Sequence, residues 1–304
     1  MKIIFLGTSS AIPTLNRNVS SVAVSFTESG KFWLLDCGEG TQHQIRKTSL
    51  KLPRLEKIFI SHLHGDHIFG LPGLLATRGM EGAKGKVEIY GPEGINSFIR
   101  ETQRITHTYI PYELEIHTLS AHDPLSIVCE NENYIVRHAS LKHNIKSYGY
   151  SIQRKSSVHF LVEKARRLNI PEGPLYAALK RGETIKLSDG RTFYGKDFLS
   201  EPIPGKKIVY CSDTAYCENS IILAESADLL IHEATFTEQD EKLAKKSFHS
   251  TIKDACKVAK KANVKHLILT HFSSRYKITK DLLAQAQSIF PNVILAKDFM
   301  EYKI

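Results

Sequence analysis

The chain has 304 residues, 42% of them hydrophobic, which is enough for one large domain or two small ones. Its 41 Lys and Arg residues exceed its 32 Asp and Glu residues, and the resulting net charge of +9 indicates either an anionic partner or simply a soluble basic surface. No segment approaches the roughly 18 to 20 consecutive apolar residues of a membrane-spanning helix, so we expect no membrane partner.

Short strands and helices alternate along the first hundred residues. Apolar, β-branched runs predict strands at 2–6, 22–26, 32–35, 57–60 and 87–90, and amphipathic patterns predict helices at 41–47, 71–77 and 95–102. The second half repeats this style, with strands predicted at 207–211, 229–231 and 266–270 and helices at 251–262 and 281–289. This alternation predicts a layered α/β architecture.

The cysteines indicate the redox environment. They are odd in number, scattered and without a C-x-x-C pair, which argues against a disulfide framework and against a thiolate metal site. The five are Cys37, Cys129, Cys211, Cys217 and Cys256. We therefore infer a reducing compartment and expect a cytoplasmic protein.

Four possible metal ligands lie within six residues, directly after the apolar run that ends at Ile60. They are His62, His64, Asp66 and His67. Alternate side chains of such a tight loop can converge on one point while their neighbours reach a second, so two metal ions are feasible. Imidazole and carboxylate ligands without thiolate suit Zn²⁺ in a catalytic site with open coordination positions.

A two-metal centre needs further ligands from elsewhere in the chain. His143 precedes the segment 147–150, Asp213 follows the predicted strand 207–211, and His271 follows the predicted strand 266–270. Taken alone, Asp213 could equally be a helix N-cap. The joint pattern of strand-end ligands favours a metal centre.

Positive charge is concentrated between residues 153 and 183, where Pro171 and Pro174 would break any long helix. Either a surface hairpin with solvated charges or a basic arm that contacts a polyanion explains this segment. Charge alone slightly favours the surface hairpin.

The ordered set of ligands resembles the metallo-β-lactamase superfamily, and further segments resemble its ribonuclease Z family over nearly the whole chain. These segments are Gly7-Thr8-Ser9-Ser10, Leu35-Asp36-Cys37-Gly38-Glu39-Gly40, His232-Glu233-Ala234-Thr235, His249-Ser250-Thr251 and Leu269-Thr270-His271-Phe272-Ser273-Ser274-Arg275-Tyr276. The resemblance implies a single α/β domain over 1–304, a four-layer αβ/βα sandwich with an inserted basic arm. It also implies an endoribonuclease that matures the 3′ end of transfer RNA.

The resemblance assigns roles by position. One zinc would be held by His62, His64 and His143, the other by Asp66, His67 and His271, with Asp213 and a water between them. Asp66 would act as general base, and His249, oriented by Glu233, would protonate the departing 3′ oxygen. The products would be a tRNA with a 3′-hydroxyl and a trailer with a 5′-phosphate.

The resemblance also turns the basic segment 153–183 into a tRNA-binding arm with a Gly-Pro element. It further implies a homodimer in which one subunit's arm serves RNA held by the other. Phosphate contacts of this kind give affinity and salt dependence with little reading of sequence. The residues expected to contact precursor tRNA are Arg17, Lys164, Arg166, Arg167, Gly173, Pro174, Lys180 and Arg181.

One segment departs from the family pattern. The loop commonly reads Pro-x-Lys-x-Arg-Asn in the family, whereas residues 13–18 here have Leu15 in place of the lysine. If the loop places the RNA 3′ end, this change bears on precursors that already encode CCA. Arg17 remains available for a phosphate.

Two alternative functions are compatible with part of this interpretation. A dinuclear hydrolase of small phosphodiesters or other small esters would share the fold and the metals, because fold does not settle function. It would have no evident use for a basic arm. An RNA-binding module with structural metals would favour closed four-ligand sites, which the mixed ligand set argues against.

Overall fold

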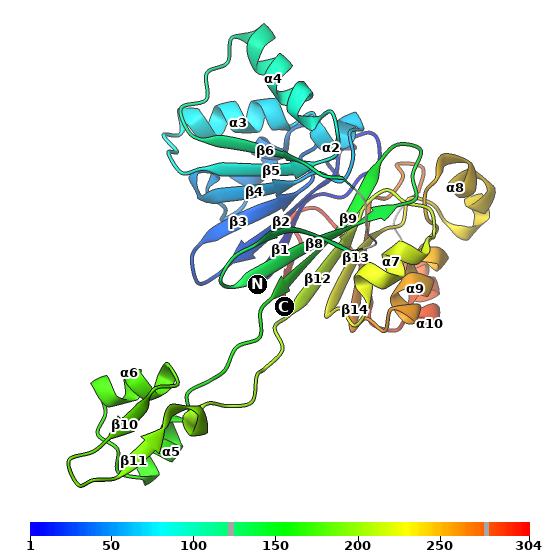
Figure 1. The fold of residues 1–304 in the computed structure, drawn as a ribbon. Coiled ribbons are helices and arrows are strands. Elements are labelled where there is room, and N and C mark those ends of the chain that lie inside the picture. The colour runs from blue at the N-terminus through cyan, green and yellow to red at the C-terminus, as the bar shows by residue number, and fades with distance from the viewer. Residues whose placement is uncertain (121–124, 277–279) are drawn as a thin grey trace. The chain divides into compact units, whose positions relative to one another are not determined.

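The computed structural model describes residues 1–120, 125–276 and 280–304, and the chain divides into two compact units (Figure 1). The larger unit comprises Met1–Asn131, Ile135–Ile152 and Lys207–Ile304, and the smaller unit comprises Glu132–Tyr134 and Gln153–Lys206. Over the described residues, no helix has the length and apolar character that a bilayer crossing requires.

The first sheet of the larger unit has the strand order β16-β1-β2-β3-β4-β5-β6 within the described residues. Strands β3 to β6 are parallel, so their carboxyl ends share one edge of the sheet. The strands are β1 (Lys2–Gly7), β2 (Ser21–Phe26), β3 (Lys31–Leu35), β4 (Leu55–Phe59), β5 (Val87–Gly91), β6 (Leu114–Thr118) and β16 (Glu301–Lys303).

The second sheet has the order β15-β14-β13-β12-β9-β8-β7, again counted over the described ranges. Strands β12 to β15 are parallel, and β7 and β8 form an antiparallel pair. The strands are β7 (Ser126–Glu130), β8 (Tyr134–Leu141), β9 (Ser147–Arg154), β12 (Lys207–Cys211), β13 (Leu229–Glu233), β14 (His266–Thr270) and β15 (Val293–Leu295).

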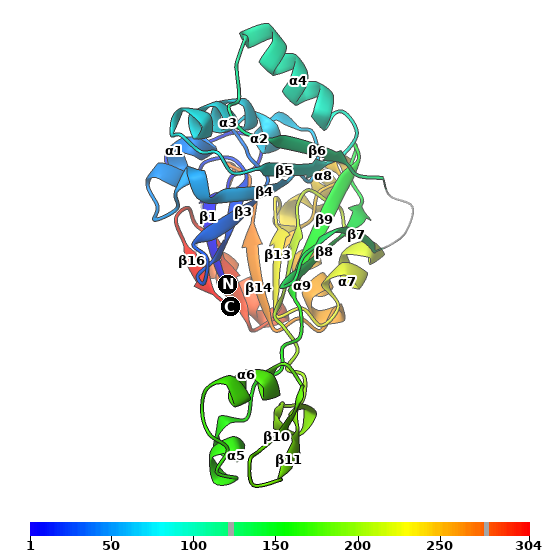
Figure 2. The ribbon, with the colours of Figure 1, turned by 60° about the vertical axis from the view of Figure 1, so that its left-hand side comes forward.

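The two sheets face each other, and helices cover their outer faces (Figure 2). The first sheet carries α1 (Thr41–Arg46), α2 (Gly65–Ile68), α3 (Leu71–Met80), α4 (Ile95–Thr106) and the short η1 (Leu52–Arg54). The second carries α7 (Glu218–Ala224), η3 (Glu238–Asp240), α8 (Glu241–Ser247), α9 (Ile252–Lys261) and α10 (Lys280–Ile289). This is the predicted four-layer αβ/βα sandwich.

Aromatic side chains join the two sheets near the site. The rings of Phe59 on β4 and Tyr150 on β9 lie 5.4 Å apart, and the Tyr150 hydroxyl donates to the carbonyl of Ile60 at 2.6 Å. Buried hydroxyls need such a partner. These contacts fix the end of β4 against the second sheet, so that the loop after β4 meets the strand ends of the other half of the sandwich.

The smaller unit has a core of its own, formed by Ala165, Ile170, Leu179, Ile185 and Phe198. Its elements are α5 (Val162–Arg167), α6 (Pro174–Lys180), β10 (Thr184–Lys186), β11 (Thr192–Tyr194) and η2 (Gly195–Phe198). The unit runs to Lys206, beyond the expected limit at 183, because the β10–β11 hairpin and Phe198 complete this core.

Candidate metal centre

Three imidazoles and one carboxylate converge where β4, β8 and β12 end. His62 Nε2 lies 3.1 Å from His64 Nδ1, which in turn lies 3.3 Å from His143 Nε2. Asp213 Oδ2 lies 3.5 Å from His62 Nε2. All four ligand atoms lie within 4.8 Å of one another, a spacing that a single metal ion can span.

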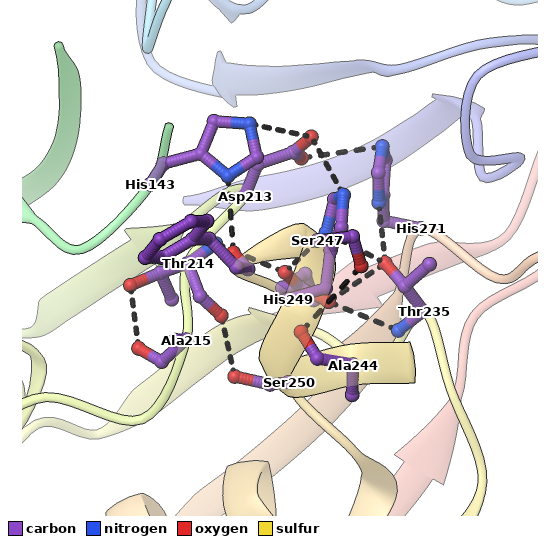
Figure 3. A network of polar contacts seen from close by, with 12 residues as sticks. His143, Asp213, Thr214, Ala215, Thr235, Ala244, Ser247, His249, Ser250 and His271 are labelled. Carbon is purple, nitrogen blue, oxygen red and sulfur yellow. Dashed lines mark hydrogen bonds and ion pairs between the residues drawn. The ribbon is translucent and has the colours of Figure 1, made fainter. Parts of the chain in front are cut away.

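A second group adjoins the first and combines Asp66, His67 and His271. Asp66 Oδ2 lies 3.3 Å from His67 Nε2 and 3.6 Å from His271 Nε2. Asp213 turns its other oxygen, Oδ1, to this group, at 3.4 Å from His67 Nε2 and 3.2 Å from His271 Nε2. The two oxygens of one carboxylate therefore face different groups (Figure 3).

The remaining nitrogens of these imidazoles are held by hydrogen bonds. Ser61 Oγ donates to Asp36 Oδ2 at 2.8 Å and accepts from His62 Nδ1 at 2.9 Å. Thr235 Oγ1 likewise donates to a carboxylate, that of Glu233, and accepts from His271 Nδ1 at 2.9 Å. The same arrangement of acid, hydroxyl and imidazole thus occurs in both halves of the sandwich. Because each hydroxyl donates to its carboxylate, it must accept from the imidazole, so Nδ1 carries the proton in both histidines and Nε2 is left available for a metal.

His67 and His143 are oriented by other acceptors. Asp36 Oδ2 accepts from His67 Nδ1 at 2.8 Å, and the carbonyl of Phe248 accepts from His143 Nδ1 at 3.0 Å. Each imidazole therefore points a lone pair into the space between the two groups. Orientation by such partners is typical of metal-ligating histidines.

Two buried atoms test whether metal ions fit. His67 Nε2 and His271 Nε2 are buried and have no hydrogen-bond partner among the described residues. Leaving a buried nitrogen without a partner is costly. A cation would satisfy both nitrogens and the facing carboxylates at once, and the nitrogen and oxygen donors suit zinc or a similar divalent ion. The residues present fit a metal centre.

The electrostatics place several of these groups in the protonation state that a metal requires. Burial lowers the pKa of His143 to about 4, which leaves the imidazole neutral. Although burial favours the neutral acid, the interaction with the nearby His67 and His271 holds the pKa of Asp66 well below its usual range. A neutral imidazole and an ionised carboxylate are the ligand forms.

A further pair, His249 and Glu233, lies beside the centre. The capping box of Thr251 and Asp254 begins α9 and fixes the preceding segment. His249 Nδ1 lies 2.7 Å from Glu233 Oε1. His249 Nε2 lies 3.9 Å from Asp213 Oδ2 (Figure 3). Burial disfavours the charged imidazole, but the charge and hydrogen bond of Glu233 outweigh it and raise the pKa of His249 to about 9. The pair can supply a proton.

The loop 8–18 is tied to the centre from the other side. The backbone N–H of Ala11 donates to Asp66 Oδ2 at 2.8 Å. Arg17 Nη1 donates to Thr8 Oγ1 and to the carbonyl of Ala296, and Thr8 Oγ1 donates to Asp298 Oδ1 at 2.6 Å. Burial lowers the pKa of Arg17, against the opposing charge of Asp298. The guanidinium of Arg17 is therefore engaged in holding the loop.

The other residues expected to contact RNA lie in the smaller unit. Lys164 Nζ donates to the carbonyl of Asp197, Arg166 pairs with Glu163 and Glu172, and Arg181 pairs with Glu183. Gly173, with a φ of 112°, caps α6, which begins at Pro174. Only glycine adopts this φ readily. Arg167 and Lys180 are exposed and make no ion pair within the part of the chain that the structure describes.

Sequence reasoning assigned no orienting role to Asp36, Ser61, Thr235 or Phe248, although Asp36 and Thr235 lie in segments that carry the family resemblance. Asp36 could have been found, because it is an acid that directly follows the apolar strand β3, as Asp213 follows β12. No local signal marks Thr235 or the Phe248 carbonyl as partners of His271 and His143, since both depend on tertiary contact.

Comparisons with known proteins agree with this geometry. Residues 1–162 match the family model "Anti-Pycsar protein Apyc1", and residues 196–272 match the "Beta-lactamase superfamily domain". A "Ribonuclease Z" from Synechocystis sp. is 48% identical over 310 residues, covering 100% of this chain and 94% of the relative. One from Nostoc sp. is 46% identical, covering 100% and 95%.

Solved structures extend these similarities. The crystal structure of human tRNase Z, short form, has a TM-score of 0.74 and 32% sequence identity, covering 100% of this chain and 99% of that one. YhfI of Bacillus subtilis, a metallo-β-lactamase fold protein, has a TM-score of 0.70 at 18% identity and shares the fold. The Apyc1 model ends before β12, whereas the ribonuclease Z relatives span both sheets and the smaller unit. The chain belongs to the ribonuclease Z family.

Proposed function

We propose that this protein is a metal-dependent endoribonuclease that removes the 3′ trailer from precursor tRNA. The observation that carries the proposal is the pair of adjoining ligand groups that share Asp213, with His249 and Glu233 beside them. Such an arrangement suits phosphodiester hydrolysis, in which charge on the attacking and leaving oxygens must be stabilised and a proton must be supplied to the leaving oxygen. The full-length similarity to ribonuclease Z proteins supports RNA as the substrate.

Two zinc ions are part of the proposal. His62, His64 and His143 would hold one, Asp66, His67 and His271 the other, and Asp213 would contribute an oxygen to each. When bound, such ions neutralise phosphoryl charge and lower the pKa of water toward neutrality.

The chain's own residues would direct protons. Asp66, ionised and held by the Ala11 N–H, would accept a proton from the attacking water. His249, kept charged by Glu233, would donate a proton to the 3′ oxygen that departs from the tRNA. The products would be a tRNA with a 3′-hydroxyl and a trailer with a 5′-phosphate.

The smaller unit would contribute affinity as the tRNA-binding arm. Its exposed cations, Arg167 and Lys180 among them, would contact phosphates, which gives salt-dependent binding. A homodimer and a cytoplasmic location complete the proposal. The bacterial relatives, whose name is that of an RNA-processing enzyme, support the location.

The test is cleavage of a 3′-extended precursor tRNA by the zinc-loaded protein, with bis-(p-nitrophenyl) phosphate assayed alongside. We expect a single cut after the discriminator nucleotide, and a product tRNA that ends in a 3′-hydroxyl. Turnover of the small ester without RNA cleavage would overturn the tRNA proposal and leave a hydrolase of small phosphodiesters.

A further inference from the structure

A groove of about 670 Å³ lies in the larger unit beside the metal centre, with His249 as part of its wall. The segments after β8 and β12, one face of α8 and one face of α9 form the rest of it. Ala215 is another of its lining residues. No binding role has been assigned above to this groove.

Charge in the groove is predominantly positive. Four lysines line it, against the two carboxylates of Glu241 and Asp254; these lysines are Lys142, Lys245, Lys257 and Lys261. Lys245 is paired with Glu241 at 2.7 Å, while Lys257 is 3.8 Å from Asp254, a carboxylate that already accepts from Thr251. Lys142 and Lys261 have no acidic partner within 4 Å in the described ranges. The groove therefore offers positive charge to an anion.

Two aromatic rings, those of Tyr216 and Phe248, accompany this charge, and the Lys261 ammonium lies 5.6 Å from the centre of the Tyr216 ring. Phe248 lines the groove and is 37% exposed. Its backbone has a φ of 57°, and its carbonyl accepts from His143 Nδ1. The backbone contact with a metal-ligand histidine thus fixes the position from which the ring reaches the groove. Exposed aromatic rings combined with lysines are typical of sites for single-stranded nucleic acid, where bases stack and phosphates pair.

We infer that this groove binds the RNA nucleotide on the 5′ side of the scissile phosphate, with its base on Phe248 and its phosphates at Lys257 and Lys261. The inference rests on the proposed function. A proton donor must lie within hydrogen-bond reach of the atom that it protonates, so the ribose that carries the departing 3′ oxygen must lie against His249. Because His249 lines the groove, a nucleotide placed against it can extend into the groove.

Helix α9 offers a matched pair of variants. Lys257→Ala combined with Lys261→Ala removes two charges from the groove, and Lys253→Ala combined with Lys260→Ala removes two exposed charges from the same helix outside it. We expect the groove variant to raise KM for precursor tRNA roughly tenfold relative to the control variant. The slope of log KM against log salt should fall by about 0.7 for each lost contact. Equal KM values for the two variants would overturn the inference.

The ring is tested separately by a conservative pair. Phe248→Tyr keeps a flat ring for stacking, whereas Phe248→Leu keeps only apolar volume, and both retain the carbonyl that holds His143. We expect KM for precursor tRNA to rise in the leucine variant and to match the parent in the tyrosine variant. The same KM in both variants would contradict a stacking role.

Product inhibition identifies which side of the cut the groove holds. The two inhibitors are a tRNA that ends at the discriminator nucleotide and a 5′-phosphorylated trailer oligonucleotide. The groove variant should weaken inhibition by the tRNA and leave inhibition by the trailer unchanged. The reverse pattern would place the trailer in the groove and overturn the inference. If the parent enzyme cuts no precursor at all, the proposed function fails, a result distinct from either pattern.

Discussion

The larger and the smaller unit differ in where their proposed functional polar side chains lie: mostly buried in the larger unit and exposed in the smaller one. In the larger unit the ligands around Asp213 are mostly buried, and four of the five histidines among them have their second ring nitrogen held by a hydroxyl, a carboxylate or a carbonyl. In the smaller unit Arg166 and Arg181 are exposed and pair with acids close to them in sequence. Chemistry at a phosphorus atom requires fixed directions, whereas affinity for a polyanion requires only positive charge within reach.

This contrast sets the size of the expected effects. Removing a partner from a buried charged group costs about 1.5 to 3 kcal/mol or more, while an exposed ion pair contributes at most about 1 kcal/mol. Substitutions at the buried centre of the larger unit should therefore act on turnover, and those of exposed cations in the smaller unit on binding.

The largest effect is expected for His64→Ala. Its ring nitrogen lies within 3.3 Å of both His62 and His143 ligand atoms, so its loss opens the first ligand group. Bound metal, measured by elemental analysis after dialysis, and cleavage of precursor tRNA should be lost together. His43→Ala, an exposed histidine on α1, is the control. Retention of full metal content and activity by the His64 variant would remove this ligand from the centre.

His249→Ala should keep the metal content of the parent and lower kcat by about 10²- to 10⁴-fold, because it removes only the proton donor. The measurement is single-turnover cleavage of precursor tRNA together with metal analysis. Cleavage at the parental rate would show that another group protonates the departing oxygen.

Removal of the smaller unit should raise KM for precursor tRNA by about 10²-fold or more and spare bis-(p-nitrophenyl) phosphate, since several phosphate contacts are lost at once. The chain enters and leaves this unit side by side, with Arg154 N donating to the carbonyl of Lys206 at 2.9 Å. A short glycine linker in place of residues 156–204 can therefore join the ends. Equal loss on both substrates would contradict a binding role.

The pH profile probes the pair of His249 and Glu233. The raised pKa of about 9 means that His249 is protonated below this pH and loses its proton above it. We expect kcat/KM for precursor tRNA to fall about tenfold per pH unit above 9, and this limb to be absent in His249→Ala. An unchanged limb in the variant would assign it to a different group.

The smallest effect separates free cations from paired ones in the smaller unit. Arg167→Ala with Lys180→Ala removes two cations without ion pairs among the described residues, whereas Arg166→Ala with Arg181→Ala removes two that already neutralise acids. The first combination should weaken tRNA binding a few-fold more than the second at equal change in net charge. Filter binding over a salt series measures this difference, and its absence would show that the local ion pairs do not matter.

Much of the secondary structure could be predicted from short apolar runs in the sequence. The strands β1 to β5 and β12 to β14 were predicted within a few residues, because each is a short apolar run. Strands β7 and β8 were not predicted, since β7 is only partly buried and both strands include charged residues that interrupt the apolar pattern. In the smaller unit, the three-residue strands β10 and β11 are too short for any periodicity, so its extent beyond 183 could not be seen.

In the candidate site, too, local features could be predicted from the sequence and tertiary contacts could not. The cluster from His62 to His67 is visible because its spacing is local, whereas the pairing of Asp36 with His67 joins residues 31 positions apart and follows only from the fold. Arg17 shows most clearly that sequence position alone does not reveal what a side chain contacts. Its charge and position suggest a phosphate contact, but its guanidinium donates to Thr8 and Ala296 inside the protein.

The pairing of β16 with β1 has a consequence for the order of biosynthesis. Ile3 faces Tyr302 in this pair, and Asp298 just before it accepts hydrogen bonds from Thr8 and Asn18. The loop that offers the Ala11 N–H to Asp66 is thus braced by residues made almost three hundred codons later. A nascent chain still on the ribosome lacks this brace until residues as far as Lys303 have emerged. We therefore expect nuclease activity to appear only after translation has passed this point, so that unfinished chains leave cellular RNA intact.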